Sequence, residues 1–274
     1  MKLNAPVHLL NQVRSLTDAA QLSMTPTVNF DTKFLKKQSD LNLAKIFSNH
    51  ASSDSWDTSH EKIHSLYAGN KQTGGVNIGD RRILYYLAIA QSPKRILKIG
   101  TNIGSSTLHL AYALKQIRSD SRITTVDIDD VNHPEAGVWR KIGLPLSPLE
   151  MSEQLGCLDI IDFKTTPSLD FMNSTEHRYD FIFLDGDHRA KTVYQEVSAA
   201  LSLFGSDGII ILHDYYPRGE ALFPDEKIIS GPYLALEKIM RENSDIGVLP
   251  LGRVPWQTKQ DTNLTSLAIV VKKG

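Results

Sequence analysis

Hydrophobic residues along the chain occur in short continuous runs that alternate with longer segments of helical spacing. Five runs, each ending in or followed by polar residues or glycine, predict strands at 95–99, 122–127, 158–164, 179–185 and 208–213. The segments between them repeat their apolar residues every three or four positions, as at Leu108, Ala111 and Leu114. Strands that alternate with helices predict an α/β fold built on a parallel sheet.

Two further strands follow near the end of the chain, at about 246–251 and 264–271. We expect only a short connection between them, and short connections favour antiparallel pairing. The sequence therefore predicts a terminal antiparallel hairpin, with Trp256 and the polar residues 257–263 in its loop.

The N-terminal part of the chain carries weaker patterns. Apolar residues have helical spacing from Leu9 to Leu16 and again over 34–47, whereas the polar stretch 49–60 indicates a loop. His60 and His64 are four residues apart, the spacing of a shared helix face. They are either a surface pair or two ligands of a metal that lacks an evident third ligand.

Glycines between positions 69 and 75 are typical of a flexible connection, and we place a domain boundary there. The prediction is a helical N-terminal extension or cap over 1–75, followed by a second domain over 76–274.

Composition and charge exclude several classes of protein. The 274 residues carry a formal net charge of −1, so no large field favours nucleic acid or an anionic membrane as a partner. Cys157 is the only cysteine, which excludes an intrachain disulfide and a thiolate metal cluster. The N-terminus lacks the apolar core of a signal peptide, and no apolar run is long enough to span a bilayer. We therefore expect a cytoplasmic protein.

Residues 95–107 join a buried strand, a tight turn and the start of a helix. Gly100 and Gly104 bracket the turn, and glycine allows both a positive φ and the close approach of a ligand. Such a turn at the carboxyl end of a parallel strand is typical of a nucleotide-type site. The glycine spacing is not that of a dinucleotide-binding fingerprint, and the Gly-Lys-Ser/Thr of a phosphate loop is absent.

The turn resembles the first motif of the class I S-adenosylmethionine-dependent methyltransferases, an acidic residue followed by Ile-Gly-Thr-x-x-Gly-x-Ser-Thr. Lys98 is a departure, because that family usually carries Glu or Asp there. The resemblance implies S-adenosylmethionine as the cofactor and places Gly100, Thr101, Gly104 and Ser106 at its site.

Two more polar residues extend this cofactor site along the strand ends. Asp127 ends the second strand about 20 residues after the turn, where a carboxylate accepts from both ribose hydroxyls. Ser168 opens the helix after the third strand, a junction that borders the adenine in the family that the turn resembles. A helix cap is the alternative role for Ser168.

The fourth and fifth strands end in a dense set of ionisable residues. Because these ends share one edge of the sheet, we expect Asp185, Asp187, His188, His213 and Asp214 to converge. The patterns Leu-Asp-Gly-Asp-His and Leu-His-Asp resemble methyltransferases that act on antibiotics, sugars and other small molecules, with a catechol-type layout.

This resemblance implies a Rossmann-like seven-stranded sheet, six strands parallel and one antiparallel. It implies transfer of the cofactor methyl group to a hydroxyl of a small-molecule acceptor, Asp185 as a further cofactor contact, and self-association in many relatives. Two alternatives are an NAD-type oxidoreductase and a non-catalytic S-adenosylmethionine-binding protein. The missing third glycine and the terminal hairpin argue against the first, and the converging ionisable groups argue against the second.

A divalent metal is a further implication of the resemblance. Asp185 and Asp214 match metal-binding positions of the catechol-type relatives, although Tyr215 stands where those enzymes carry an Asn ligand. His213 is the candidate replacement, and oxygen ligands favour Mg²⁺. A metal-free polar cluster is the alternative.

The acceptor hydroxyl needs a base, because it is a poor nucleophile until its proton is removed. His188 lies three residues after Asp185, the offset of the catalytic Lys in catechol-type relatives, and its ordinary pKa suits this role. His213 is the rival base.

Overall fold

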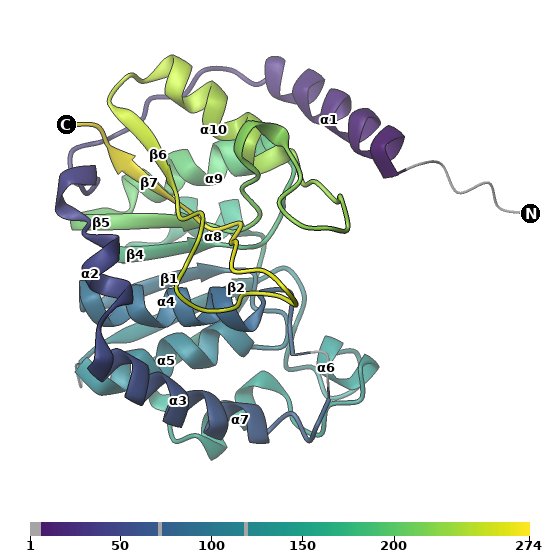
Figure 1. Cartoon of the computed structure of the whole chain (residues 1–274), viewed down its shortest axis with the longest axis vertical. Helices are drawn as coiled ribbons and strands as arrows, with labels where there is room; N and C mark the ends of the chain where they lie inside the picture. The colour runs from purple at the N-terminus through teal and green to yellow at the C-terminus, as the bar shows by residue number, and fades with distance from the viewer. Residues whose placement is uncertain (1–6, 71–72, 118–119) are drawn as a thin grey trace, which may run out of the picture.

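The chain, described in a computed structural model over residues 7–70, 73–117 and 120–274, is built on a seven-stranded sheet of order β3-β2-β1-β4-β5-β7-β6 (Figure 1). The strands are β1 (Arg95–Ile99), β2 (Arg122–Asp127), β3 (Ile161–Thr165), β4 (Tyr179–Leu184), β5 (Phe204–Leu212), β6 (Ile246–Pro250) and β7 (Ala268–Lys272). Each strand expected from the sequence is present, so the predicted Rossmann-like α/β fold is confirmed.

Strand direction also follows the prediction. The pairs β1–β2, β2–β3, β1–β4 and β4–β5 are parallel, whereas β7 is antiparallel to both β5 and β6. Six strands therefore share one direction and β7 alone opposes them. The connection of the terminal hairpin is not short, however, because residues 251–267 form a long loop that reaches back to the site described below.

Helices cover both faces of the sheet. One face carries α3 (His50–Ser65), α4 (Ile78–Gln91) and α5 (Ser105–Ile117), and the other carries α1 (Val7–Ser23), α8 (Ser168–Ser174), α9 (Ala190–Ser202) and α10 (Gly231–Glu242) (Figure 1). Shorter helices are α2 (Leu43–Phe47), α6 (Val138–Lys141) and α7 (Pro148–Gln154), with single turns at Gln38–Asp40, Leu158–Ile160 and Pro217–Gly219. No helix in the described ranges is long and apolar enough to cross a membrane.

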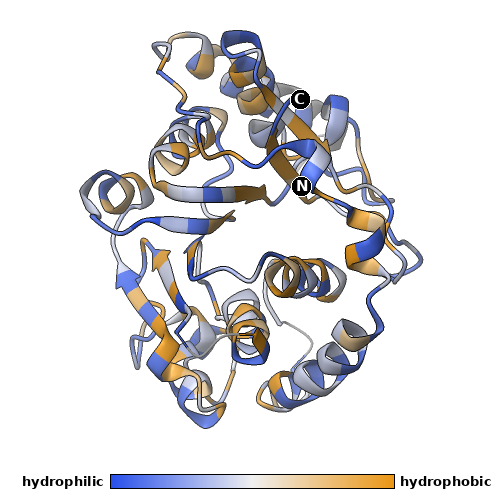
Figure 2. Cartoon of the chain, turned by 90° about the vertical axis from the view of Figure 1, so that its left-hand side faces the viewer, coloured by the Kyte–Doolittle hydropathy of each residue, from blue (hydrophilic) through white to orange (hydrophobic). Residues whose placement is uncertain are grey.

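Alternating side chains of the strands form two apolar layers, one on each face of the sheet. Figure 2 shows the stretches of hydrophobic residues in the strands and in the helices. On β4, Phe181 and Phe183 belong to the core beneath α4 and α5, whereas Ile182 and Leu184 belong to the core beneath α9 and α10. Successive side chains of a strand point to opposite faces, so a continuous apolar run fills both layers. Because β4 is buried on both faces, the polar residues that follow it lie at the carboxyl edge of the sheet, where the site described below is found.

The N-terminal part packs against both layers. α1 contacts α9 and α10, and α3 contacts α4 and α5. Between them, the Lys36 N–H donates to the Gly208 carbonyl at 3.0 Å, and the Lys36 carbonyl accepts from Lys272 at 2.9 Å. The boundary near residue 75 stays a prediction, and residues 71–72 of that connection lie outside the described residues.

The loop expected over 49–60 is wrong, because α3 occupies this stretch. The Asn49 side chain caps the helix by accepting from the Ser52 N–H at 3.0 Å, and Trp56 and Ile63 lie buried one above the other. A polar composition concealed this one-sided apolar pattern. The rings of His60 and His64 stack at 5.5 Å, and His60 Nδ1 lies 3.1 Å from His109 Nε2.

Candidate active site

The glycine turn after β1 brings two strand ends close together. Gly100 has φ +84°, and a Cβ at this position would collide with the Asp185 carbonyl oxygen at the end of β4. Gly104 has φ +79°, and a Cβ there would lie 2.9 Å from Pro148 Cβ. Both positions require glycine because of conformation and space together. Lys98 donates from Nζ to the Gly100 carbonyl, so a buried ammonium stands beneath the turn in place of the usual acid.

Asp127, at the end of β2, holds the same turn from the opposite side. Its Oδ2 accepts from the N–H groups of Thr101 at 2.8 Å and Asn102 at 2.9 Å, and its Oδ1 accepts from Asp129 at 3.1 Å. The ribose role of Asp127 stays a prediction. The geometry adds an anchoring role that sequence reasoning missed.

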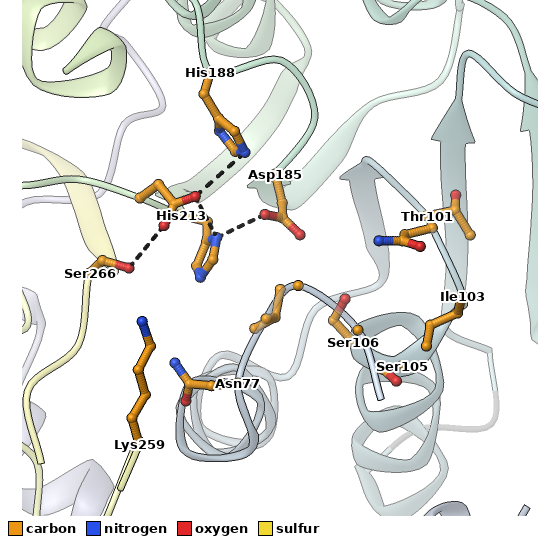
Figure 3. A pocket seen from close by; sticks show the side chains of 15 residues that line it. Asn77, Thr101, Ile103, Ser105, Ser106, Asp185, His188, His213, Lys259 and Ser266 are labelled. Atoms are coloured by element: carbon orange, nitrogen blue, oxygen red, sulfur yellow. Dashed lines mark hydrogen bonds and ion pairs between the residues drawn. The ribbon is translucent and has the colours of Figure 1, made fainter. Parts of the chain in front are cut away.

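Among the hollows beside this turn, two share Asn102 and Asp185 in their walls. The larger has a volume of about 780 Å³ and is lined by Gly100, Asp127, Ile128, Ser168 and Asp187, among others. The smaller, of about 190 Å³, is lined by Thr101, Ser106, His188, His213, Asp214 and Lys259, among others (Figure 3). The predicted site residues therefore line these two adjacent hollows, except Gly104, which packs against Pro148.

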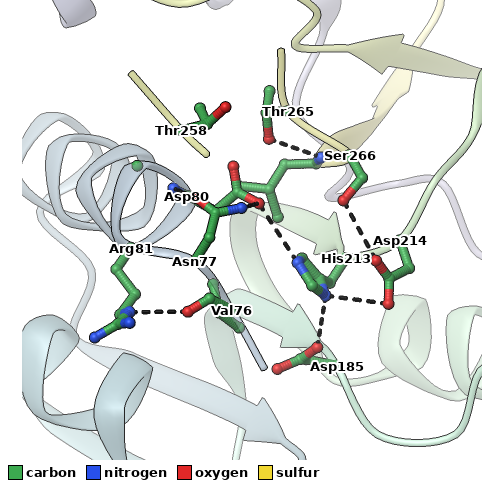
Figure 4. Close-up of polar contacts among 12 residues, drawn as sticks. Val76, Asn77, Asp80, Arg81, Asp185, His213, Asp214, Thr258, Thr265 and Ser266 are labelled. Atoms are coloured by element: carbon green, nitrogen blue, oxygen red, sulfur yellow. Dashed lines mark hydrogen bonds and ion pairs between the residues drawn. The ribbon is translucent and has the colours of Figure 1, made fainter. Parts of the chain in front are cut away.

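His213 lies buried among three carboxylates (Figure 4). Its Nδ1 is 2.9 Å from Asp185 Oδ1 and 3.4 Å from Asp214 Oδ2, and its Nε2 is 3.5 Å from Asp80 Oδ2. Burial lowers the pKa of His213, but the charges of Asp185 and Asp214 outweigh burial and raise that pKa well above 6.5. The two carboxylates thus favour the imidazolium form of His213, whose charge offsets part of theirs.

Asp80 lies in the first turn of α4. It is fully buried, accepts from Asn77 Nδ2 at 2.6 Å and faces His213. Asn77 in turn caps α4 by accepting from the Asp80 N–H at 2.8 Å. The short segment Asn-Ile-Gly-Asp before a helix was the available signal, and it gave no indication of contact with the end of β5.

His188 occupies the loop after β4, at the rim of the smaller hollow. Its Nε2 is 3.5 Å from Asp214 Oδ2, and a third of its side chain is exposed. A Cβ at Gly231, the first residue of α10, would collide with the His188 carbonyl oxygen. Gly231 therefore allows α10 to pack directly against the backbone that carries His188.

Asp214 has φ +56°, in the left-handed region where Asp is tolerated better than most residues. Burial raises its pKa, but His213 and then His188 outweigh burial and lower that pKa below 3.8. In this backbone conformation, the Asp214 carboxylate contacts both His188 and His213 through Oδ2.

Asp187 does not join this cluster, so the expected convergence of five groups is wrong at this residue. Its Oδ2 accepts from Arg189 Nε at 2.7 Å and from Thr192 at 2.9 Å, which turns it toward the larger hollow. Lys259 takes a place beside the cluster that sequence reasoning did not predict. It comes from the long loop 251–267, and its Nζ lies 3.4 Å from the centre of the Phe223 ring.

Ser168 lines the larger hollow, but the cap of α8 is Pro167, and Ser168 makes no cap hydrogen bond. The alternative role as a helix cap is therefore wrong. Its hydroxyl donates instead to Glu196 Oε1 at 2.5 Å.

The expected metal ligands Asp185, Asp214 and His213 lie together, but they do not fit a bound Mg²⁺ as arranged. No group of three or more His, Cys, Asp or Glu side chains in the described part of the chain is arranged to hold a metal ion. The physical reason is His213. Its Nδ1 lies 2.9 Å from Asp185 Oδ1 and 3.4 Å from Asp214 Oδ2, so the ring takes the place between the two carboxylates that a cation would need.

Comparison with known proteins shows which proteins this chain is similar to. Residues 97–215 match a methyltransferase domain. A probable caffeoyl-CoA O-methyltransferase from Dictyostelium discoideum is 28% identical over 142 residues, which cover 49% of this chain and 54% of that protein. The chain thus spans about half the length of the curated relative that it matches.

Solved structures share the fold over nearly the whole chain. A putative O-methyltransferase from Klebsiella pneumoniae superposes with a TM-score of 0.56 at 19% identity, covering 97% of this chain and 100% of its own. An O-methyltransferase from Bacillus cereus, solved with S-adenosylhomocysteine, gives a TM-score of 0.56 at 18% identity over 96% and 100%. Residues 97–215 thus match a methyltransferase domain, and the chain shares the fold of these solved O-methyltransferases, in agreement with the resemblance seen in the sequence.

Proposed function

We propose that this chain transfers the methyl group of S-adenosylmethionine to a hydroxyl oxygen of a small molecule. The observation that supports it most is the pair of adjacent hollows that share Asp185, one large enough for a nucleoside and the other lined by a histidine–carboxylate pair. The proposal puts the reacting sulfonium beside Asp185.

The proposal assigns the adenosine part of the cofactor to the larger hollow. Gly100 lets the backbone approach it, Asp127 offers its free lone pairs to the ribose, and Ser168 borders the base. The methionine part is assigned to the smaller hollow, beside Thr101 and Ser106. Gly104 acts indirectly, by fixing the start of α5.

His188 is proposed as the base. His213 is poorly suited, because carboxylates face both its ring nitrogens and favour its protonated form. His188 contacts Asp214 through Nε2 only, which leaves Nδ1 for the acceptor. Asp214 then stabilises the imidazolium that forms, as the carboxylate does in other histidine–carboxylate pairs.

In the proposed step, the acceptor oxygen attacks the methyl carbon as its proton passes to His188. The bond between that carbon and sulfur breaks, and its electron pair stays on sulfur. A cationic sulfonium and a neutral hydroxyl become a neutral thioether, an ether and a protonated His188, so charge and atoms balance. No step passes through a metal, because His213 already provides positive charge between Asp185 and Asp214.

The test is methyl transfer from labelled S-adenosylmethionine to a panel of hydroxyl compounds by the full chain. The panel includes caffeoyl-CoA, the compound in the name of the Dictyostelium relative. We expect His188→Ala to bind S-adenosylhomocysteine normally but to lose about 10²–10⁴-fold in rate at neutral pH. The loss should shrink as pH rises, because hydroxide then removes the proton. His177→Ala, at an exposed histidine, is the matched control. Near-normal turnover of His188→Ala at neutral pH would remove His188 from this role.

A further inference from the structure

A buried carboxyl stands behind the wall of the larger hollow. Glu196, on α9, is 1% exposed, and its Oε1 accepts from the Ser168 hydroxyl at 2.5 Å. Its Oε2 has no hydrogen-bond partner within the described ranges. An acidic side chain this deep, with one oxygen unpartnered, is costly to the fold and calls for an explanation.

The position of the pair relates it to the hollow. Ser168 lines the hollow together with Pro167, Leu169 and Asp127, and Thr192, one turn before Glu196 on α9, lines it as well. Glu196 does not line the hollow and lies behind Ser168. A ligand in the hollow would therefore contact Ser168, and Ser168 in turn contacts Glu196.

A hydroxyl has a single proton, and a carboxylate can only accept hydrogen bonds. When Ser168 donates to Glu196, the lone pairs of its oxygen are what remain for the hollow. A lone pair attracts an amino group and repels a carbonyl oxygen.

We infer that Glu196 makes Ser168 an obligate acceptor, and that the pair thereby selects a 6-amino purine over a 6-oxo purine in the cofactor. Glu196 is thus a positioning residue, and Ser168 is the residue that contacts the base. The inference rests on the proposed function, since it needs the adenine in this hollow. It assigns a role to a residue that no sequence motif indicated.

The test compares S-adenosylhomocysteine with S-inosylhomocysteine, which differ in the amino or carbonyl group at position 6 and in the proton that the 6-oxo base carries on the adjacent N1. Calorimetric titrations of the full chain are made at about pH 8, where Glu196, whose pKa burial raises to about 7, is ionised. For the unmodified chain we expect the amino ligand to bind about 10- to 100-fold more tightly, because the wrong partner leaves two acceptors facing each other.

Glu196→Gln is the decisive variant, because a Gln amide can donate to Ser168 and free its proton for the hollow. The preference should then fall to within about threefold or reverse. Ser168→Ala should also lose the preference, whereas Ser174→Ala, at an exposed serine of the same helix, should keep it.

The outcomes separate the two claims. If S-adenosylhomocysteine fails to bind the unmodified chain, the proposed function fails. If it binds and Glu196→Gln keeps the full preference for the amino ligand, the inference is overturned while the proposed function stands. Should Glu196→Gln not fold, an unchanged preference in Ser168→Ala overturns the inference by itself.

Discussion

Replacing Asp127 separates two roles that its side chain combines. One oxygen accepts from the N–H groups of Thr101 and Asn102 and so holds the glycine turn. The proposed function adds a ribose contact. Asp127→Ala removes both, whereas Asp127→Asn keeps one oxygen for the turn and places an amide donor where the second oxygen was.

The magnitudes follow from the contacts. A hydrogen bond to a charged group contributes about 1.5–3 kcal/mol. Thr101 is buried, so its N–H has no replacement partner, whereas Asn102 and Asp129 are exposed enough for water to substitute. Asp127→Ala should therefore lower the free energy of unfolding by about 2–4 kcal/mol, and Asp127→Asn by about 1 kcal/mol.

Thermal unfolding and calorimetry with S-adenosylhomocysteine measure the two effects separately. We expect a clear fall in Tm for Asp127→Ala only, and roughly tenfold weaker binding for Asp127→Asn. Asp162→Asn, at an exposed acid of the adjacent β3, is the control. An unchanged Tm in Asp127→Ala would refute the anchoring of the turn, and unchanged binding in Asp127→Asn would refute the ribose contact.

Three further predictions concern charge. Burial raises the pKa of Glu196 from 4.5 to about 7, so the folded state favours the protonated carboxyl. This contribution to the free energy of unfolding is fully present below about pH 4.5 and is lost as the pH rises through 7. Glu196→Gln should thus gain about 2–3 kcal/mol over the unmodified chain between about pH 5 and pH 8 in urea unfolding, and a parallel pH dependence of the two proteins would contradict this. Burial, followed by the charge of Arg81, lowers the pKa of His60 to about 4. Stability linked to His60 should therefore fall as pH drops from 6.5 towards 4, seen as faster hydrogen exchange in α3 that His60→Gln abolishes. Exhaustive chelation should leave methyl transfer unchanged because His213 lies between the expected ligands, and loss of activity restored by Mg²⁺ would refute that reasoning.

The sequence predicted the strands well because a parallel strand covered on both faces must be continuously apolar, as at 181–184. It also located the ends of β1, β2, β4 and β5, since polar residues and glycine interrupt such runs abruptly. Asp185 and His213 follow from these strand ends by topology, and His188 lies in the loop that continues from β4.

Other features depend on contacts that no local pattern encodes. Asp80 and Lys259 reach the cluster from positions far along the chain from β5, so their spacing carries no information about it. Asp187 lies beyond the end of β4, where alternation no longer fixes direction and Arg189 captures its carboxylate. The direction of a loop side chain is set by its partners rather than by its position in the sequence.

The most direct test of the account is titration of the full chain with S-adenosylhomocysteine and, separately, with NAD. The account predicts that S-adenosylhomocysteine binds at one site per chain and raises Tm, and that NAD does neither, because the turn at Gly100 and Gly104 lacks the dinucleotide spacing. Binding of NAD, or the absence of any heat or Tm shift with S-adenosylhomocysteine, would contradict it.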